Sequence, residues 1–322
     1  MIKKASRILV TGVAGFIGSH LAERLVSMGN EVFGLDNFSS GRMENLALMK
    51  KTKNFQLIKG DILKPRDLTK ARDIDLIFHL AAQSSVPKST DDPIKDFEIN
   101  VRGTLNVLEY ARRVDAGALI FASSSTVYGE AKVLPTPEDH PLLPISNYGA
   151  AKAAGEIYCA TYCSLYDIMT ASLRYYNIYG PRCRRGVMFD LLEKLRRDGG
   201  SLEVLGTGRQ RKDYLYIQDA VEATLLVAEK GRLSGEAYNV GSGEAHTVEE
   251  LVRILLKISG LGRKTKILYK GGLSWPGDVQ KIQADIAKLR KLGFTPKVEI
   301  ERGIGAFVNW YQSEYGRIAA SF

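Results

Sequence analysis

The fold of the first half of the chain is decided by the stretch ILVTGVAGFIGSH, residues 8–20. Its apolar start predicts a buried strand, and three glycines follow at three-residue intervals, at Gly12, Gly15 and Gly18. In this pattern the first glycine permits a tight turn, the second lets the backbone approach a diphosphate, and the third allows the next helix to pack closely on the strand. We therefore expect that helix to present its free N–H groups to the phosphates of a dinucleotide.

An acidic residue at the end of the second predicted strand completes this pattern. Asp36 stands there, directly after the apolar run 31–35. Its carboxylate would accept hydrogen bonds from the ribose hydroxyls and repel a 2′-phosphate, which favours NAD over NADP. Asp61 ends the third predicted strand, and two roles stay open for it: a contact with the adenine, or the N-cap of the next helix.

Short apolar runs alternate with amphipathic helical patterns as far as residue 173. The predicted strands are residues 7–10, 31–35, 56–59, 76–80, 118–122 and 169–173. The predicted helices between them are residues 17–28, 43–50, 65–72, 96–113 and 149–165. This alternation is typical of the α/β class, and it predicts a Rossmann-type doubly wound parallel sheet with right-handed crossovers.

A chain of 322 residues is longer than a single core usually accommodates, so we expect two parts. The second half predicts helices at 189–197, 248–259, 285–292 and 300–314, and strands at 213–216 and 238–240 that rejoin the main sheet. We therefore assign residues 1–177, with about 213–240, to a dinucleotide-binding domain. Residues 178–212 and 241–322 form a smaller mixed α/β substrate domain, and the proline-rich segment 130–147 is a long loop.

Composition excludes several classes of protein. No run approaches the roughly 18 apolar residues of a membrane span, and a strand predicted so near the N-terminus leaves no room for a signal peptide, so we expect a cytoplasmic protein. Three cysteines without a C-x-x-C pair and four unclustered histidines predict no metal site. The net charge is +9, of which residues 178–322 carry +7. A solvated basic surface explains it best and an anionic substrate next, since no nucleic-acid motif is present.

Two tyrosines have a lysine four residues later, and their contexts differ. Lys132 follows Tyr128 into the proline-rich loop, where side chains four residues apart need not face one way. Tyr148 and Lys152 open an alanine-rich helix, which places both side chains on one face. A nearby ammonium favours the phenolate of a tyrosine and makes it a base near neutral pH. We therefore expect Tyr148 to be the base, with Lys152 beside it.

Three serines, residues 123–125, follow the predicted strand 118–122, where parallel α/β sheets place ligands. One hydroxyl would hydrogen-bond the reacting oxygen; a serine-rich turn without a ligand is the alternative. Together with the glycine-rich turn, this constellation predicts hydride transfer at a carbinol carbon.

The chain resembles the extended short-chain dehydrogenase/reductases, and within them the UDP-galactose (UDP-glucose) 4-epimerases. The resemblance runs over essentially the whole chain. It rests on residues 11–21, 36–37, 79–82, 100, 123–129, 148–152, 174–182, 213–217, 239–241 and 275–279.

This resemblance implies a set of site residues. It implies catalysis by Ser124, Tyr148 and Lys152. It implies NAD binding by Gly12, Gly15, Phe16, Ile17, Gly18, Asp36, Asn37, Ser39, Ser40, Gly41, Asp61, Ile62, Leu80, Ala81, Ala82, Gln83, Asn100, Tyr148, Lys152 and Tyr175. It implies binding of a UDP-hexose by Ser124, Ser125, Tyr148, Asn177, Val187, Val204, Arg211, Tyr214, Trp275 and Asp278.

The resemblance also implies a reaction. The sugar C4 is oxidised, the 4-keto sugar turns over in the pocket, and C4 is reduced from the opposite face. The related 4,6-dehydratases place an Asp-Glu pair, and the UDP-glucuronate decarboxylases a Glu, where this chain has Ser125 and Thr126. Neither side chain ionises near neutral pH, which favours epimerisation. Another nucleotide-sugar modifier is the alternative; a non-catalytic dinucleotide-binding regulator fits less well, because Tyr148 and Lys152 are both present.

The chain departs from the family where many members carry two phosphate-binding arginines. Lys212 and Trp275 stand at those positions, and a lysine lacks the planar fork of an arginine. Four arginines are candidates to compensate: Arg182, Arg184, Arg209 and Arg211.

The resemblance further implies a homodimer, formed through the predicted helices 96–113 and 149–165. Four apolar residues on them fit an exposed interface, or else cover the sheet: Leu105, Leu108, Tyr158 and Tyr162.

Overall fold

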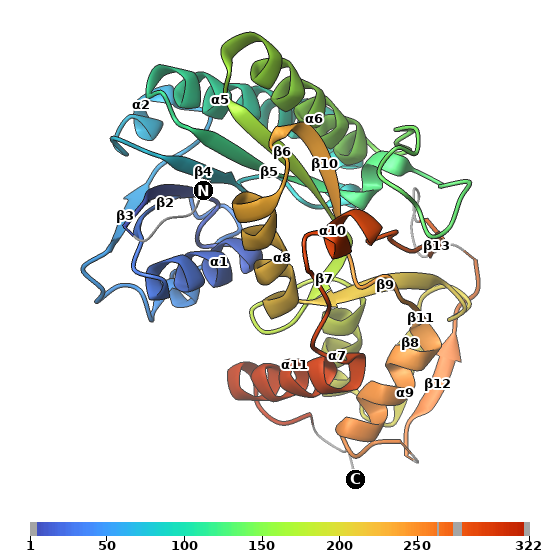
Figure 1. Cartoon of the computed structure of the whole chain (residues 1–322). Helices are drawn as coiled ribbons and strands as arrows, with labels where there is room; N and C mark the ends of the chain where they lie inside the picture. Colours follow the sequence, from blue (N-terminus) through green and yellow to red (C-terminus); the bar gives the residue numbers. More distant parts are fainter. Residues whose placement is uncertain (1–4, 263, 273–278, 319–322) are drawn as a thin grey trace.

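The computed structural model describes residues 5–262, 264–272 and 279–318, and a seven-stranded sheet dominates it (Figure 1). The strands are β1 (Arg7–Thr11), β2 (Glu31–Asp36), β3 (Phe55–Lys59), β4 (Leu76–His79), β5 (Ala118–Ser124), β6 (Met169–Tyr175) and β10 (Ser234–Val240). Their order is β10-β6-β5-β4-β1-β2-β3, and every neighbouring pair runs parallel. The predicted α/β class and the doubly wound parallel sheet are confirmed.

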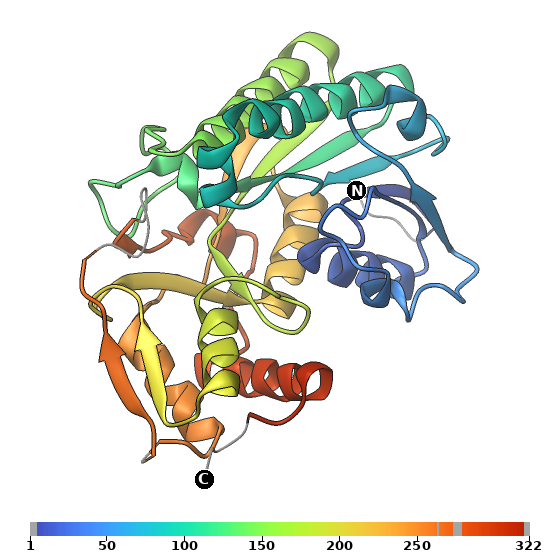
Figure 2. The same ribbon diagram turned by 180° about the vertical axis from the view of Figure 1, so that it is seen from behind.

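Helices cover both faces of this sheet because its strands are apolar on both faces. In β1, Ile8 and Val10 belong to one hydrophobic cluster and Leu9 to another. The first cluster continues into α1 (Phe16–Ser27) and α8 (Ile217–Lys230), and the second into α2 (Pro65–Leu68), α5 (Gly103–Arg113) and α6 (Asn147–Tyr166). Figures 1 and 2 show α5 and α6 on one side of the sheet and α1 with α8 on the other.

The order of the strands in the sheet indicates where a ligand would bind. The chain passes from β1 to β2 on one side, and β4 pairs with β1 on the other. Ligands of open parallel sheets bind at such a reversal, beyond the carboxyl ends of the strands. The glycine-rich turn begins at the carboxyl end of β1, so it lies at this expected ligand site.

A second sheet forms the centre of the smaller part, the lower body of Figure 1. Strand β9 (Arg211–Tyr216) pairs with β7 (Asn177–Tyr179), β11 (Ala245–Thr247) and β13 (Lys281–Ile282), while β8 (Ser201–Val204) pairs with β12 (Lys266–Tyr269). The helices here are α7 (Val187–Arg197), α9 (Val248–Ile258) and α11 (Ile300–Tyr315), whereas α10 (Ala287–Lys291) packs against β10 of the main sheet.

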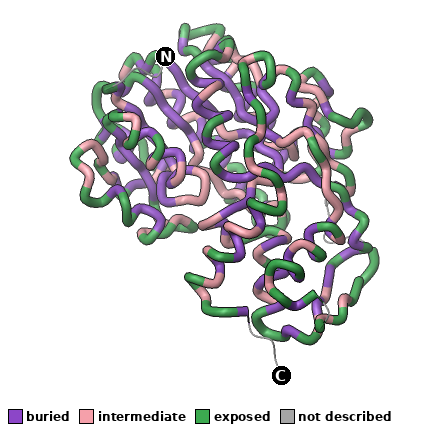
Figure 3. The backbone as a smooth tube through the Cα atoms, turned by 60° about the horizontal axis from the view of Figure 1, so that its bottom comes forward, coloured by how far each residue is buried: buried purple, intermediate pink, exposed green. Residues whose placement is uncertain are grey.

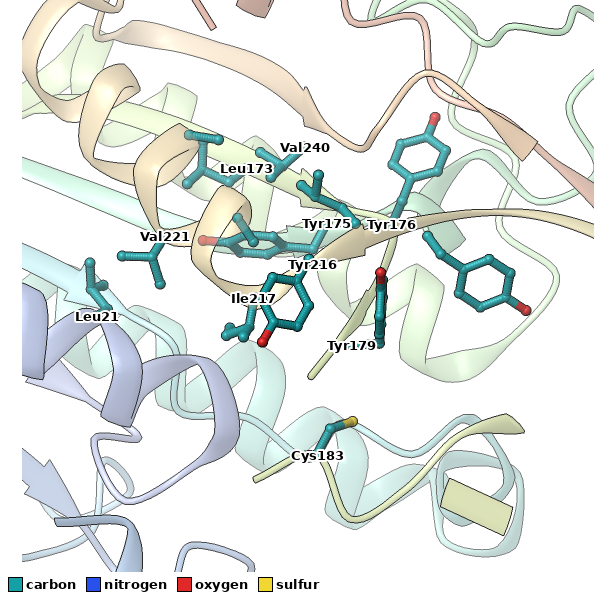
Figure 4. Close-up of a cluster of buried hydrophobic side chains, with 14 of the residues drawn as sticks. Leu21, Leu173, Tyr175, Tyr176, Tyr179, Cys183, Tyr216, Ile217, Val221 and Val240 are labelled. Carbon is teal, nitrogen blue, oxygen red and sulfur yellow. The ribbon is translucent and has the colours of Figure 1, made fainter. Parts of the chain in front are cut away.

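The prediction that strand 213–216 rejoins the main sheet was wrong. It belongs to β9 of the smaller sheet, and only the strand predicted at 238–240, within β10, joins the main one. One hydrophobic cluster extends from β6 and β10 to β7 and β9. Figure 4 shows its labelled side chains, with Tyr175 of β6, Tyr179 of β7 and Tyr216 of β9 among them. In Figure 3 the buried residues are concentrated in the interior of the larger part, and exposed residues lie mostly on its outer loops.

Several predicted helices are shorter or broken in the structure. Residues 43–50 contain a 3₁₀ turn, Met43–Leu46, and residues 65–72 contain only α2. The predicted helix 96–113 comprises the end of α4 (Pro93–Phe97), a π-helical turn (Glu98–Arg102) and α5, and α3 (Val86–Asp91) precedes it. Helix α8 was not among the predicted elements. Among the described residues, no helix is both long and apolar enough to cross a membrane.

Candidate active site

The β1–α1 turn has the geometry of a diphosphate cradle. Gly12 has φ +71°, and a Cβ there would lie 2.7 Å from the Ala81 nitrogen, while a Cβ on Gly18 would collide with the Gly12 carbonyl oxygen. Gly15 is the N-cap of α1, and no side chain of the described residues caps that helix end. The first N–H groups of α1 are therefore open to an anion, so the residues fit the dinucleotide that the sequence predicts.

Asp36 is held firmly at the carboxyl end of β2. Its carboxylate accepts hydrogen bonds from the Ala14 nitrogen (2.9 Å) and the Phe38 nitrogen (2.8 Å). Burial raises the pKa of Asp36, and these two N–H groups oppose the rise. A Cβ on Gly41 would lie 2.8 Å from the carboxylate, so a glycine is required there. Each carboxylate oxygen keeps a lone pair for a ribose hydroxyl.

A hydrogen bond joins Asn37, in the loop after β2, to Asp61, which follows β3. The Asn37 amide donates to Asp61 Oδ2 (3.1 Å), and Asp61 Oδ1 accepts from the Leu63 nitrogen (2.9 Å). The N-cap of α2 is Lys64, so the alternative that Asp61 caps this helix was wrong. Ser39 and Ser40 lie on the same loop, and the Ser39 nitrogen donates to Asn37. Ile62 is buried against Gly103 of α5.

The turn after β4 is built by hydrogen bonds to its backbone. Thr11 Oγ1 accepts from the nitrogens of Leu80 and Ala81, both at 3.2 Å. Asn100 accepts from the Gln83 nitrogen (3.0 Å) and donates to the Gln83 carbonyl (2.9 Å) and to Asp96 (2.8 Å). Both N–H groups of the Asn100 amide are thereby used, so in this structure Asn100 shapes the turn 80–83.

The catalytic residues predicted on β5 and α6 lie together. Ser146 caps α6 by accepting from the Gly149 nitrogen, which sets Tyr148 in the first turn and Lys152 one turn later. Ser124 ends β5, where its hydroxyl accepts from Thr126 Oγ1 (3.0 Å) and lowers the pKa of the Tyr148 phenol. The Ser123 hydroxyl instead donates to Glu156 inside the protein. The structure therefore favours Ser124 over Ser123.

The electrostatics of the dyad differ in part from the prediction. Burial raises the pKa of the Tyr148 phenol, while the Arg185 guanidinium and the Ser124 hydroxyl lower it. The sequence predicted Lys152 as the source of that charge effect, and in the structure the cation that lowers the pKa is Arg185. Burial lowers the pKa of Lys152 to about 8, and Asp96 opposes this shift. The Lys152 Nζ donates to the Ala122 carbonyl (2.7 Å) and lies 5.9 Å from the Tyr148 ring centroid.

Tyr128, the other tyrosine with a lysine four residues later, has a structural role. Tyr128 is 2% exposed. Its hydroxyl donates to Asn239 Oδ1 (2.7 Å) and accepts from Arg174 Nη1 (2.8 Å). Because this hydroxyl is buried and fully engaged, Tyr128 is part of the core polar network, and Tyr148 is the tyrosine available for chemistry.

The residues predicted to bind substrate lie on several elements, and two of them are buried. Asn177 begins β7 and donates to the Asp213 carbonyl (2.9 Å), Val187 opens α7, and the exposed Arg211 lies on β9. Val204 and Tyr214 are buried at 1% and 6% exposure. Ser125 opens the 3₁₀ turn after β5, whereas Trp275 and Asp278 lie outside the described residues.

Three other predicted residues are engaged inside the protein. The Tyr175 hydroxyl pairs with Thr224 of α8 (2.6 Å) within the core shown in Figure 4. Arg182 donates to Glu23 of α1, and Arg184 donates to Asn45 and Glu314. These two arginines join the smaller part to the larger. Arg211 also donates to the Ala245 carbonyl (2.8 Å) but is exposed, so it remains a candidate for the phosphates together with Arg209.

Sequence reasoning missed two charged residues beside the dyad. Asp96 lies four residues before Asn100 and shares its helix face, a signal that the spacing carried. Arg185 reaches the site from the loop before α7 and donates to the Ser84 carbonyl (2.9 Å), 101 positions away. No local pattern could reveal that contact.

Comparison with known proteins places the chain among sugar-nucleotide enzymes. The family described as GDP-mannose 4,6 dehydratase matches residues 9–307. The chain belongs to this family. A putative UDP-glucose 4-epimerase of Methanocaldococcus jannaschii is 35% identical over 95% of this chain and 98% of its own length. The UDP-glucose 4-epimerase of Mycolicibacterium smegmatis is 36% identical over 96% and 99%. A solved UDP-galactose 4-epimerase is 42% identical, with a TM-score of 0.85 and coverage of 96% and 99%. The predicted kinship with the extended short-chain dehydrogenase/reductases is confirmed.

Family members with other reactions match nearly as well. The UDP-glucuronic acid decarboxylase 1 of Xenopus tropicalis is 33% identical over 97% of this chain and 73% of its own length. A dTDP-glucose 4,6-dehydratase of Streptomyces venezuelae, solved with NAD, is 30% identical with a TM-score of 0.88. The family is therefore one of nucleotide-sugar epimerases and dehydratases, with NAD as the cofactor of solved members. The expectation of NAD is confirmed at this level.

Proposed function

We propose that this protein interconverts UDP-galactose and UDP-glucose by oxidising and re-reducing C4 of the sugar. The observation that carries the proposal is the position of Tyr148 and Lys152 one helical turn apart on α6. Lys152 Nζ lies 5.9 Å from the Tyr148 ring centroid and donates to Ala122 of β5, the strand that ends at Ser124 at the carboxyl edge of the parallel sheet. The 4-epimerases among its relatives support the choice of reaction.

The dinucleotide would be held by the β1–α1 turn, by Asp36 and by the loops after β2 and β4. When bound, NAD supplies an acceptor and later a donor of hydride for the sugar C4. The open N–H groups of α1 would face its diphosphate, and the Asp36 carboxylate its ribose. We propose that Lys152 contacts the nicotinamide ribose as well as the carbonyl of Ala122.

Tyr148 would move the proton of the sugar 4-hydroxyl. In the oxidation it takes this proton as a phenolate, and in the reduction it returns the proton to the 4-keto oxygen. Ser124 lowers the pKa of the Tyr148 phenol and would form a hydrogen bond with the same sugar oxygen. Between the two steps the 4-keto sugar turns over, which requires that the chain grip the nucleotide more firmly than the hexose.

Simple epimerisation is favoured over elimination by the residues beside Ser124. Water loss or decarboxylation chemistry in related enzymes uses carboxyl groups at the two positions after this serine. Here Ser125 and Thr126 stand there, and the Thr126 hydroxyl donates to Ser124 (3.0 Å). A threonine that is already committed to the serine supplies neither an acid nor a base near neutral pH.

The test uses the purified protein with a panel of UDP-galactose, UDP-N-acetylglucosamine and UDP-glucuronate. Chromatography and mass spectrometry follow each product without added NAD. We expect UDP-glucose of unchanged mass from UDP-galactose. A product lighter by carbon dioxide or water would contradict the proposal, and epimerisation of another sugar on the panel in place of UDP-galactose would reassign its substrate.

We further propose a homodimer that forms through α6. Of the residues predicted for this interface, Leu108 and Tyr162 are buried inside the chain at 0% and 9% exposure, so the prediction was wrong about them. They cover the sheet instead. Tyr158, which was also predicted, is 38% exposed, and two further apolar residues of α6 are exposed as well: Ile157 (62%) and Leu165 (65%). We likewise propose that the larger part binds the cofactor and the smaller part binds the substrate.

A further inference from the structure

A buried carboxylate stands next to the catalytic dyad and has no role so far. Asp96 of α4 is 1% exposed. Its Oδ1 accepts hydrogen bonds from Gln83 Nε2 and Asn100 Nδ2, both at 2.8 Å. Among the described residues, its Oδ2 has no hydrogen-bond partner. A carboxylate buried in this way costs free energy unless a nearby positive charge compensates it.

The ammonium group of Lys152 supplies a positive charge that acts on this carboxylate without a direct ion pair. Helix α4 packs against α6, and Asp96 is the first of the groups that raise the pKa of Lys152 against the effect of burial. In return, Lys152 helps to lower the pKa of Asp96, which burial raises. The same carboxylate raises the pKa of Tyr148. Asp96 therefore acts on both members of the dyad while touching neither by a direct hydrogen bond.

We propose that Asp96 is a positioning residue whose negative charge keeps Lys152 protonated beside Tyr148 and sets the pH range in which the dyad works. The geometry that supports this is the fixed Oδ1, held by two amides, the buried and unpartnered Oδ2, and the packing of α4 against α6. The inference rests on the proposed function, because it concerns the same tyrosine and lysine.

Other ionisable groups surround the dyad, and their effects can be separated. They are Glu156 and Cys159 of α6, His79 of β4 and Arg185 of the loop before α7. Glu156 is paired with Arg174 at 2.7 Å. Burial raises the pKa of Cys159 and lowers that of His79, so both are uncharged near neutral pH. Arg185 alone opposes Asp96, since it lowers the pKa of both Tyr148 and Lys152.

The test is the substitution Asp96→Asn, which keeps an acceptor for Gln83 and Asn100 but removes the charge. The readout is the pH profile of kcat for the NAD-loaded protein with UDP-galactose. Turnover requires a deprotonated Tyr148 and a protonated Lys152, so the two limbs together report the pKa values of this coupled pair. Loss of Asp96 lowers both pKa values, so we expect both limbs to move to lower pH by about one unit.

Two variants serve as matched controls. Asp92→Asn removes a carboxylate from the same helix, where Asp92 is the exposed N-cap and asparagine caps equally well; its limbs should stay in place. Arg185→Gln removes the opposing charge, and its limbs should move to higher pH. Asp96→Glu, which restores the charge, should return the limbs towards those of the unaltered protein.

Limbs that stay in place in Asp96→Asn, with only a lower maximum, would overturn the proposal and leave Asp96 a structural role. A shift to higher pH would overturn it as well. If Asp96→Asn does not fold, Asp96→Ser, whose hydroxyl still accepts from Asn100, replaces it with the same expected direction.

A second readout separates this inference from the proposed function. The tyrosinate absorbance of Tyr148, taken as the difference from Tyr148→Phe, is titrated in the NAD-loaded protein without any sugar. Asp96→Asn should lower that pKa even if UDP-galactose is not the substrate. An unchanged titration would reject the role of Asp96, whereas a shifted titration with no turnover would reject only the proposed reaction.

Discussion

Tyr148 and Tyr128 form a natural pair for a test at the scale of the residue. Each has a lysine four positions later, but Tyr148 lies in the first turn of α6, where Ser124 lowers its pKa, while Tyr128 is buried with Arg174 and Asn239. We expect Tyr148→Phe to lower kcat by at least about 100-fold, the usual contribution of a positioned acid–base group, and to leave NAD binding intact.

Tyr128→Phe should behave in the opposite way. It leaves the buried Asn239 Oδ1 without its donor and removes one of the two acceptors of Arg174 Nη1, which costs about 1–3 kcal/mol of stability, but it touches no reacting atom. Steady-state kinetics and thermal melting of the two variants distinguish them. Equal losses of turnover in the two variants would refute the assignment of the base.

At the scale of the element, the β1–α1 turn tolerates no side chain at its third glycine. A Cβ on Gly18 would collide with the carbonyl of Gly12, so Gly18→Ala should destabilise the protein by about 1–3 kcal/mol and weaken NAD binding. Gly305→Ala is the control, because a Cβ in α11 would meet nothing closer than Ile258, at 4.0 Å. That variant should gain about 0.5–1 kcal/mol. Denaturant unfolding measures the stability of each variant, and titration measures its NAD affinity. Unchanged stability and NAD affinity in Gly18→Ala would contradict the close packing.

The elements also show what the sequence could predict. The glycine-rich turn, Asp36 and the helix that carries Tyr148 are set by local patterns, and the structure places them as expected. The pairing of β9 with the smaller sheet was not predictable, because an apolar run specifies a strand but not its partner. Arg185 and Asp96 act on the dyad through tertiary packing, so their roles appear only once the β7–α7 loop and α4 are placed.

At the scale of the whole molecule, a buried histidine links stability to pH. His79 is 1% exposed between Thr11 and Thr104, and burial lowers its pKa from 6.5 to about 3. The unfolded chain binds a proton below pH 6.5 that the folded protein excludes. The stabilisation is therefore complete above pH 6.5 and is lost as pH falls towards 3, by about 1.4 kcal/mol per pH unit. Chemical denaturation across this range should show a flatter dependence for His79→Gln; an equal slope would assign the effect to other groups.

The proposed dimer is tested by substituting two exposed leucines, one inside the proposed interface and one outside it. Leu165 on α6 is 65% exposed, and Leu48, between β2 and β3, is 73% exposed. Leu165→Lys should lower the sedimenting mass from that of a dimer to that of a monomer, because a charge would be buried in the interface. Leu48→Lys should leave the dimer intact. A monomeric unaltered protein, or a dimer that survives Leu165→Lys, would contradict the α6 interface.

The most direct measurement of the central claim follows the hydrogen at C4. UDP-galactose carrying deuterium at C4 is converted by the NAD-loaded protein, and the UDP-glucose is analysed by mass spectrometry and NMR. Oxidation and re-reduction of one sugar within one site predict that the deuterium remains at C4. Its replacement by hydrogen from water would contradict the account.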